Sequence, residues 1–256
     1  MIKRYGKNPC EIALLHGGPG AIGSLRPLAR ALTKSYGTAE LLQTKYTIAA
    51  LLEELSSDLQ SVTTKPITLL GHSWGAWLAI LYAAQFPALV KQLILVGCGP
   101  LTEAYVPQIL AHRLANLSEA DAKEYRAILA ALDDPAYGNK EGLLQKLGAL
   151  TKSSDNYNLI PMQDETVLNS AMYTAIWQQA AALRKSGALL QSCRKIRCPI
   201  TLIQGAYDPH PLEGVTAPLQ EAGISYTAHL LENAGYSPFY EAEASAAFYE
   251  ILHGLL

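Results

Sequence analysis

Three short segments of the sequence combine residue types that could do nucleophilic chemistry. The first, residues 71–75, reads Gly-His-Ser-Trp-Gly and fits the pattern G-x-S-x-G. Small residues on both sides of a serine allow a sharp strand-to-helix turn, which exposes the serine hydroxyl beside a helix N-terminus that favours negative charge. The pattern therefore makes Ser73 a candidate nucleophile.

The second segment, residues 16–20, reads His-Gly-Gly-Pro-Gly. Glycines let the backbone approach an oxyanion closely, so the N–H groups of Gly18 and Trp74 could together stabilise the negative charge that develops on a substrate carbonyl. Pro19 has no N–H to donate. We interpret His16 as a residue that braces this loop through hydrogen bonds rather than as a catalyst.

The third segment, residues 205–211, reads Gly-Ala-Tyr-Asp-Pro-His-Pro. Asp208 follows Ser73 in the chain, as the acid follows the serine in enzymes that use a serine, an acid and a histidine in this order. Such an acid orients the histidine. The alternative reading is an Asp-Pro turn without a catalytic role.

Each segment comes directly after a short apolar run that is typical of a buried strand. The alternation of strands with amphipathic helices predicts an α/β fold with a mostly parallel sheet and helices on both faces. Ligands of such sheets bind outside the carboxyl ends of the strands, where the three segments would meet. The expected strands span residues 11–16, 39–43, 66–70, 93–96, 199–204 and 225–231, and the clearest helices span residues 48–62, 74–86 and 239–252.

The character of the chain changes between residues 102 and 190. Leu, Ala, Gln and Lys dominate there, and no β-branched run appears, which favours helices without strands. We therefore predict a core domain made of residues 1–101 and 191–256, with residues 102–190 inserted as a helical cap.

Composition excludes several classes of function. The 256 residues carry a net charge of −2 and no long Lys/Arg cluster, so we expect no nucleic-acid partner. The four cysteines lack the spacing of a zinc site, and we expect no metal, no cofactor and no disulfide framework. Since no apolar run is long enough to span a bilayer and the N-terminus lacks a signal-peptide core, we expect a cytoplasmic protein without a membrane partner. The oligomeric state is left open.

Together with residues 233–239, which read Asn-Ala-Gly-Tyr-Ser-Pro-Phe, the three segments resemble the α/β-hydrolase superfamily. The similarity is greatest to proline iminopeptidases and related small serine hydrolases. It implies an α/β-hydrolase fold with a helical cap, but it does not extend through residues 102–190. The N-terminus is short, so we expect the antiparallel edge strands of that fold to be reduced or absent.

The last motif departs from the family, whose G-H-x-P pattern carries the general base. Tyr236 stands at the histidine position, and a neutral tyrosine accepts protons poorly at pH 7. Loss of this base from a comparable triad costs on the order of 10⁶ in kcat. His210 lies close to Asp208 in the chain and is a candidate substitute base; His72 and His229 are weaker alternatives. In the remaining reading, Tyr236 fills the imidazole's space and donates a hydrogen bond to Asp208.

The leading hypothesis is a serine hydrolase that acts on a small ester or a peptide-like amide. The alternative is a catalytically impaired hydrolase that binds a small molecule or a partner, and a lyase on the same fold is a third reading. Aromatic residues of the insertion, Trp177 and Tyr173 among them, could line an apolar pocket or simply pack in a core. An aminopeptidase would need a carboxylate for the substrate's ammonium. The acidic residues of the insertion are Glu103, Glu119, Glu124, Asp164 and Glu165. Each of them could equally well be an ordinary solvent-exposed residue on a helix surface.

Overall fold

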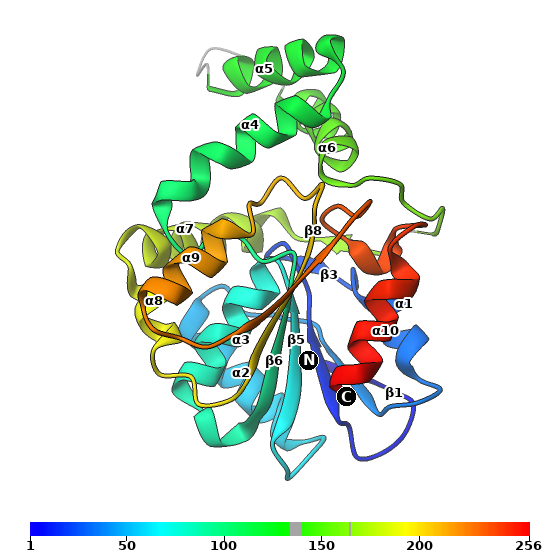
Figure 1. The fold of residues 1–256 in the computed structure, drawn as a ribbon, viewed down its shortest axis with the longest axis vertical. Helices are drawn as coiled ribbons and strands as arrows, with labels where there is room; N and C mark the ends of the chain where they lie inside the picture. Colours follow the sequence, from blue (N-terminus) through cyan, green and yellow to red (C-terminus); the bar gives the residue numbers. More distant parts are fainter. Residues whose placement is uncertain (134–139, 164) are drawn as a thin grey trace.

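The computed structural model describes residues 1–133, 140–163 and 165–256, and its centre is a mixed β-sheet (Figure 1). In this part of the chain, seven strands form the sheet in the order β1-β4-β2-β5-β6-β8-β9. All neighbouring strands pair in parallel except β1, which is antiparallel to β4. The strands are β1 (Ile2–Tyr5), β4 (Thr38–Leu41), β2 (Ile12–Leu15), β5 (Ile67–His72), β6 (Val90–Val96), β8 (Ile200–Gly205) and β9 (Thr227–Leu231). The fold predicted from the sequence is thus confirmed.

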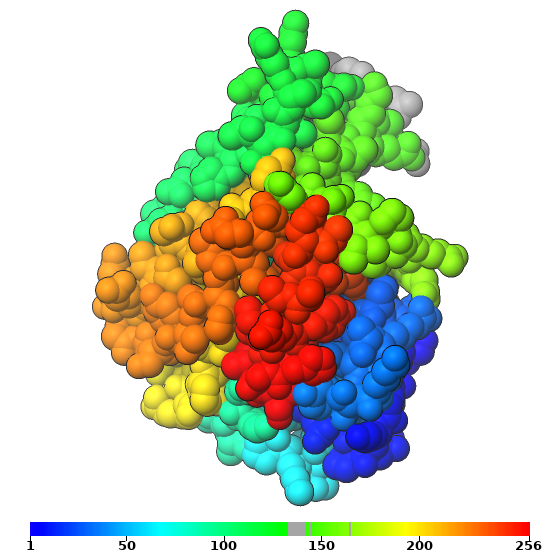
Figure 2. All heavy atoms as spheres, turned by 45° about the vertical axis from the view of Figure 1, so that its right-hand side comes forward, coloured from blue at the N-terminus to red at the C-terminus, as the bar shows by residue number. Residues whose placement is uncertain are grey.

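Helices cover both faces of the sheet, and this explains why the central strands are mostly apolar. Strands β2, β5 and β8 are buried along their whole length, as expected for parallel strands covered on two sides. One core cluster lies between the sheet and α2 (Ile48–Gln60), α3 (Trp74–Gln85), α8 (Ala188–Cys193) and α9 (Glu213–Glu221). The opposite cluster is covered by α1 (Arg26–Leu32) and α10 (Ser245–Leu255), which lie side by side in Figures 1 and 2.

Three helices stand beyond the carboxyl ends of the strands. They are α4 (Val106–Asn116), α5 (Glu119–Asp133) and α6 (Lys140–Asp155), and Figure 1 shows them above the sheet. In Figure 2 they form a projection at the top of the molecule. The chain then returns to the sheet, where α7 (Ser170–Lys185) buries Met172, Ile176 and Ala180 in the first core cluster.

Two details of the sequence prediction for this region and its surroundings are wrong. The segment 102–190 does contain a strand, because β7 (Val167–Leu168) pairs antiparallel with β3 (Ala21–Ile22). Both residues of β7 are exposed and the strand is only two residues long, so no periodic pattern marks it. The last helix begins at Ser245 rather than at residue 239, because η3 (Pro238–Tyr240) forms a separate 3₁₀ turn that starts at a proline.

The amino-terminal edge of the sheet is short but present. Strand β1 pairs with β4 from Ile2 opposite Leu41 to Tyr5 opposite Thr38. The edge is therefore reduced to one antiparallel strand of four residues. The remaining short turns are η1 (Pro87–Leu89) and η2 (Glu103–Tyr105). Within the described residues, no helix is both long enough and apolar enough to cross a bilayer.

Candidate active site

Ser73 occupies a strained turn between β5 and α3. Its backbone has φ 52° and ψ −116°, a region that residues with a side chain rarely adopt. The turn has room only for glycine on both sides: a Cβ added to Gly75 would lie 2.0 Å from the Leu15 carbonyl oxygen, and one added to Gly71 would lie 2.3 Å from the Gly75 oxygen. The G-x-S-x-G pattern thus follows from the packing of this turn against β2.

The Ser73 side chain borders a cavity of about 510 Å³. Gly18, Pro19 and Trp74 line the same cavity, so the structure brings the glycine loop and the serine turn together as the sequence suggested. As the first residue of α3, Trp74 has no acceptor for its N–H within the helix. Gly18 has φ 57°, and its carbonyl accepts a hydrogen bond from the Ala21 N–H, which closes the glycine loop.

His16 lies behind this loop and is fully buried. Its Nδ1 lies 3.0 Å from the Gly17 carbonyl oxygen. The His16 carbonyl accepts from Gln43 Nε2 at 3.3 Å, and Gln43 Oε1 accepts from Trp74 Nε1 at 2.9 Å. This chain of contacts ties the glycine loop to the start of α3. Burial lowers the pKa of His16 to about 4, so the ring is neutral at neutral pH.

The buried Asp208 and the partly buried His210 form a pair in the loop after β8. Asp208 Oδ1 accepts from the His210 backbone N–H at 2.9 Å and lies 2.7 Å from His210 Nδ1. Asp208 Oδ2 accepts from Gln204 Nε2 at 2.7 Å. Burial raises the pKa of Asp208, and the pairing with His210 opposes that shift. An ionised Asp208 selects the tautomer with the proton on Nδ1, which leaves Nε2 of His210 as the free proton acceptor.

His210 lines the same cavity as Ser73. Its contact with Asp208 places the candidate substitute base named from the sequence beside the candidate acid. The sequence analysis missed Gln204. It is a polar residue at the end of a mostly apolar strand, and that break in the pattern is the one signal the sequence offers for it.

Tyr236 lines the same cavity as Ser73 and His210. Its ring lies 5.5 Å from the His210 ring, centroid to centroid. Burial raises the pKa of Tyr236 well above its ordinary value, so the phenol is neutral. The expected hydrogen bond from Tyr236 to Asp208 is replaced by these contacts, since the Asp208 oxygens face Gln204 and His210.

The other histidines lie outside the lining of the Ser73 cavity. His72 is buried, its Nε2 donates to the Tyr236 carbonyl oxygen at 2.9 Å, and burial lowers its pKa to about 4. His229 lies on edge strand β9 and His253 on α10. His112 is exposed on α4, but its Nδ1 donates to the carbonyl oxygen of Pro209 at 3.0 Å, which attaches α4 to the His210 loop.

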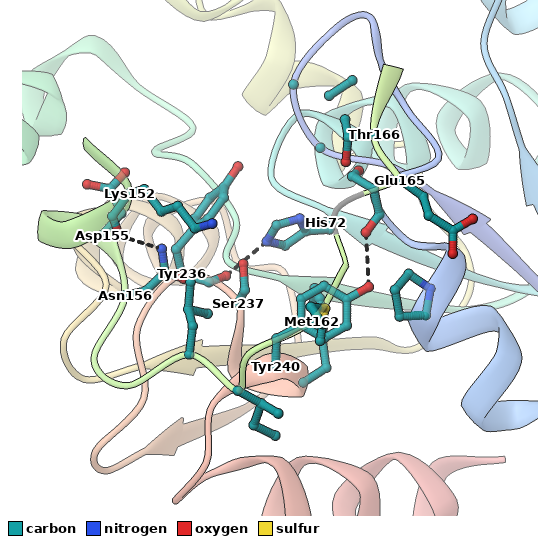
Figure 3. A pocket seen from close by; sticks show the side chains of 18 of the residues that line it. His72, Lys152, Asp155, Asn156, Met162, Glu165, Thr166, Tyr236, Ser237 and Tyr240 are labelled. Carbon is teal, nitrogen blue, oxygen red and sulfur yellow. Dashed lines mark hydrogen bonds between the residues drawn. The ribbon is translucent and has the colours of Figure 1, made fainter. Parts of the chain in front are cut away.

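A second cavity of about 640 Å³ adjoins the first, and Gly18, Thr151, Asp155 and Tyr236 line both. Figure 3 shows His72, Tyr236 and Ser237 facing this second cavity, with Asp155 and Glu165 on opposite sides of it. Ser73 and His210 are absent from its lining. Among the described residues, no cluster of three His, Cys, Asp or Glu side chains is arranged to hold a metal ion.

Comparison with known proteins gives a family and a fold. The model of the alpha/beta hydrolase family matches residues 13–250. An uncharacterized protein of Mycobacterium tuberculosis is 25% identical over 221 residues, which is 82% of this chain. The chain spans 62% of the length of that relative.

Solved structures with this fold cover nearly the whole chain. VinJ superimposes with a TM-score of 0.74 at 18% identity, over 99% of this chain and 93% of VinJ. The proline iminopeptidase of Mycobacterium smegmatis gives a TM-score of 0.67 at 15% identity, over 99% and 94% of the two chains. A carboxylesterase structure from Nitrososphaera gargenis gives 0.63 at 19% identity, over 100% and 93%. Since the family match extends over nearly all of the sheet and its helices, the chain belongs to the alpha/beta hydrolase family.

Proposed function

We propose that the protein is a serine hydrolase of the esterase type that cleaves a small ester or amide, with Ser73 as nucleophile and His210 as general base. One observation carries the proposal: the Asp208–His210 pair, with Nδ1 and Oδ1 2.7 Å apart, borders the same cavity as the strained serine turn. Membership of the alpha/beta hydrolase family supports hydrolysis as the reaction class.

In this mechanism, Ser73 Oγ attacks the substrate carbonyl while its proton passes to His210 Nε2. The N–H groups of Gly18 and Trp74 stabilise the oxyanion, and one such donor is worth about 10²–10³ in kcat. The imidazolium then protonates the leaving alcohol or amine. A water molecule repeats the sequence on the acyl-enzyme and releases the acid. Asp208 stays ionised, orients the ring and stabilises its positive charge.

The base is displaced from the loop after β9 to the loop after β8, where the acid also lies. Tyr236 occupies the place that the family gives to histidine. As a neutral phenol it cannot take the serine proton, but in this mechanism its hydroxyl donates a hydrogen bond to Ser73 Oγ and holds it in position, since both residues line the same cavity. Tyr236 is therefore a positioning residue in this proposal.

A second candidate is a protein that binds a small molecule or partner on this site without turnover. The observation that favours it is the same Tyr236 side chain, which lines the Ser73 cavity and adjoins the His210 ring. In that case the serine proton would have no acceptor, and the cavity would serve binding alone.

Hydrolysis of p-nitrophenyl butyrate separates the two candidates. The first predicts turnover by the natural protein and a loss of at least about 10³ in kcat for both Ser73→Ala and His210→Ala. His229→Ala, on an edge strand outside both cavities, is the matched control and keeps full activity. An inactive natural protein whose Tyr236→His variant hydrolyses the ester would instead favour the binding protein.

A further inference from the structure

A ladder of aromatic side chains leads away from Ser73 along one wall of its cavity. Trp77 lies on α3, one helical turn after the serine, and its ring stacks on Trp177 of α7 with centroids 5.8 Å apart and planes within 7°. Trp177 stacks in turn on Tyr173, with centroids 6.1 Å apart and planes within 11°. All three residues line the cavity of Ser73.

The ladder runs from the core to the surface. Trp77 is 3% exposed, Trp177 36% and Tyr173 48%. The Trp77 Nε1–H donates to the Gly99 carbonyl oxygen at 3.0 Å, so the indole's polar atom is satisfied inside the protein. The ladder therefore offers an apolar surface that begins near the nucleophile and ends at solvent.

The charged side chains that line this cavity are bound in ion pairs. Arg113 holds Asp155 through two hydrogen bonds of 2.8 and 2.7 Å. Arg184, whose guanidinium lies 5.5 Å from the Trp77 ring, bonds Glu103 at 2.9 Å. Asp155 is the one carboxylate among the described residues that line this cavity, and Arg113 neutralises it. The described part of the lining therefore offers no unpaired carboxylate for a substrate ammonium.

The described acidic residues of the insertion that could bind a substrate ammonium either lie outside this cavity or are already paired with arginines. Glu103 is bound to Arg184, and Glu165 is held by Arg26 and Arg30 on α1. Asp164 lies outside the described residues. The charge distribution around Ser73 therefore favours an uncharged substrate group.

We propose that this uncharged group is an apolar acyl chain, which lies along the Trp77–Trp177–Tyr173 ladder while Ser73 attacks the carbonyl to which it is attached. The inference rests on the proposed hydrolase function and names its substrate class. The acyl half is assigned to the ladder because it stays bonded to Ser73 through both half-reactions, whereas the alcohol leaves after the first. The ladder suits the acyl half, because it begins at Trp77 on the helix that follows Ser73 and Trp77 is fixed in the core.

Turnover of p-nitrophenyl esters from acetate to octanoate tests the proposal. In the natural protein, kcat/KM rises by up to about fourfold for each added methylene that the ladder buries. Trp177→Ala lowers the octanoate value at least tenfold and leaves acetate nearly unchanged, while Trp177→Phe keeps most of the preference. Tyr157→Ala is the matched control, because Tyr157 is 48% exposed like Tyr173 but lines neither cavity.

A binding experiment keeps the test independent of catalysis. Ser73→Ala is titrated with a trifluoromethyl ketone that carries a hexyl chain and with its methyl homologue, using tryptophan fluorescence. If the hexyl compound binds more tightly than the methyl compound, and if Ser73→Ala/Trp177→Ala loses this difference, the result supports the ladder as the site of the chain. This holds even if the natural protein hydrolyses no ester, and in that case only the hydrolase proposal fails.

Three results would overturn the inference. They are equal affinity for the two ketones, equal losses for acetate and octanoate in Trp177→Ala, and a preference for prolyl p-nitroanilide with a free amino group over the octanoate ester.

Discussion

Lowering the pH from 8 to 5 should destabilise the folded protein, because His16 and His72 are buried as neutral rings. His16 is fully buried and His72 is 5% exposed, and burial lowers the pKa of each to about 4. In the unfolded chain both rings titrate near their ordinary pKa of about 6.5. The unfolded state therefore binds these protons first, and the stabilisation is complete above pH 6.5 and is lost as the pH falls toward 4.

The magnitude follows from the two pKa values. At pH 5, an unfolded-state pKa of about 6.5 and a folded-state pKa of about 4 correspond to a loss of about 2 kcal/mol per histidine relative to pH 8. The two together give about 4 kcal/mol. Asp208 acts in the opposite direction, since its raised pKa favours proton uptake by the folded state as the pH falls. The net contribution of these three groups to the loss is therefore at most about 4 kcal/mol.

Urea unfolding at pH 8, 6.5 and 5 measures the effect. His72→Gln keeps an amide that can donate to the Tyr236 carbonyl but has no titrating group, and His16→Asn does the same toward Gly17. Each variant should show about 2 kcal/mol less pH dependence than the natural protein, whatever its stability at pH 8. A stability that stays flat from pH 8 to 5, or variants that keep the full pH dependence, would refute the assignment of neutral buried rings.

Two further comparisons of variants test the packing around the site. Gly75→Ala should lower the free energy of unfolding, measured in urea, by about 3 kcal/mol or more, because its Cβ would lie 2.0 Å from the Leu15 carbonyl oxygen. Gly148→Ala on α6 is the comparison: a Cβ there meets nothing within 4 Å, so this variant should gain up to about 1 kcal/mol. Equal effects of the two substitutions would contradict the account of the serine turn. Asp155→Ala should lower the free energy of unfolding by about 2–3 kcal/mol, because it leaves Arg113 without its partner. The double variant Arg113→Met/Asp155→Leu should recover most of that loss. A double variant as unstable as Asp155→Ala would contradict the ion-pair reasoning.

Much of the fold was predictable because the sheet is covered on both sides. Residues 67–70 and 200–203 are short runs that are apolar except for one threonine each, and each is followed by a glycine-containing segment that carries a candidate site residue. Such runs arise whenever both faces of a strand are buried, so they are visible without any knowledge of the neighbours. Strand β7 escaped prediction because its two exposed residues carry no comparable pattern.

The candidate site was only partly predictable. The backbone requirements at Ser73 and Gly18 leave a local signature, since small residues must flank a strained turn. The partner of Asp208 leaves none: His210 and Tyr236 both follow strands, and which of them contacts the acid depends on loop conformations that are set by tertiary packing. Tyr173 and Trp177 stand four residues apart on α7, and the sequence allowed them as the lining of an apolar pocket. Their junction with Trp77 of α3 spans a long sequence separation, so the sequence gives no sign of it.

Covalent labelling of Ser73 by a fluorophosphonate, followed by peptide mass mapping, tests the central claim most directly. The proposal that His210 activates Ser73 predicts one adduct on Ser73 in the natural protein, labelling at least about 100-fold slower in His210→Ala, and an unchanged rate in His229→Ala. An unlabelled Ser73, or a His210→Ala variant labelled as fast as the natural protein, would contradict it.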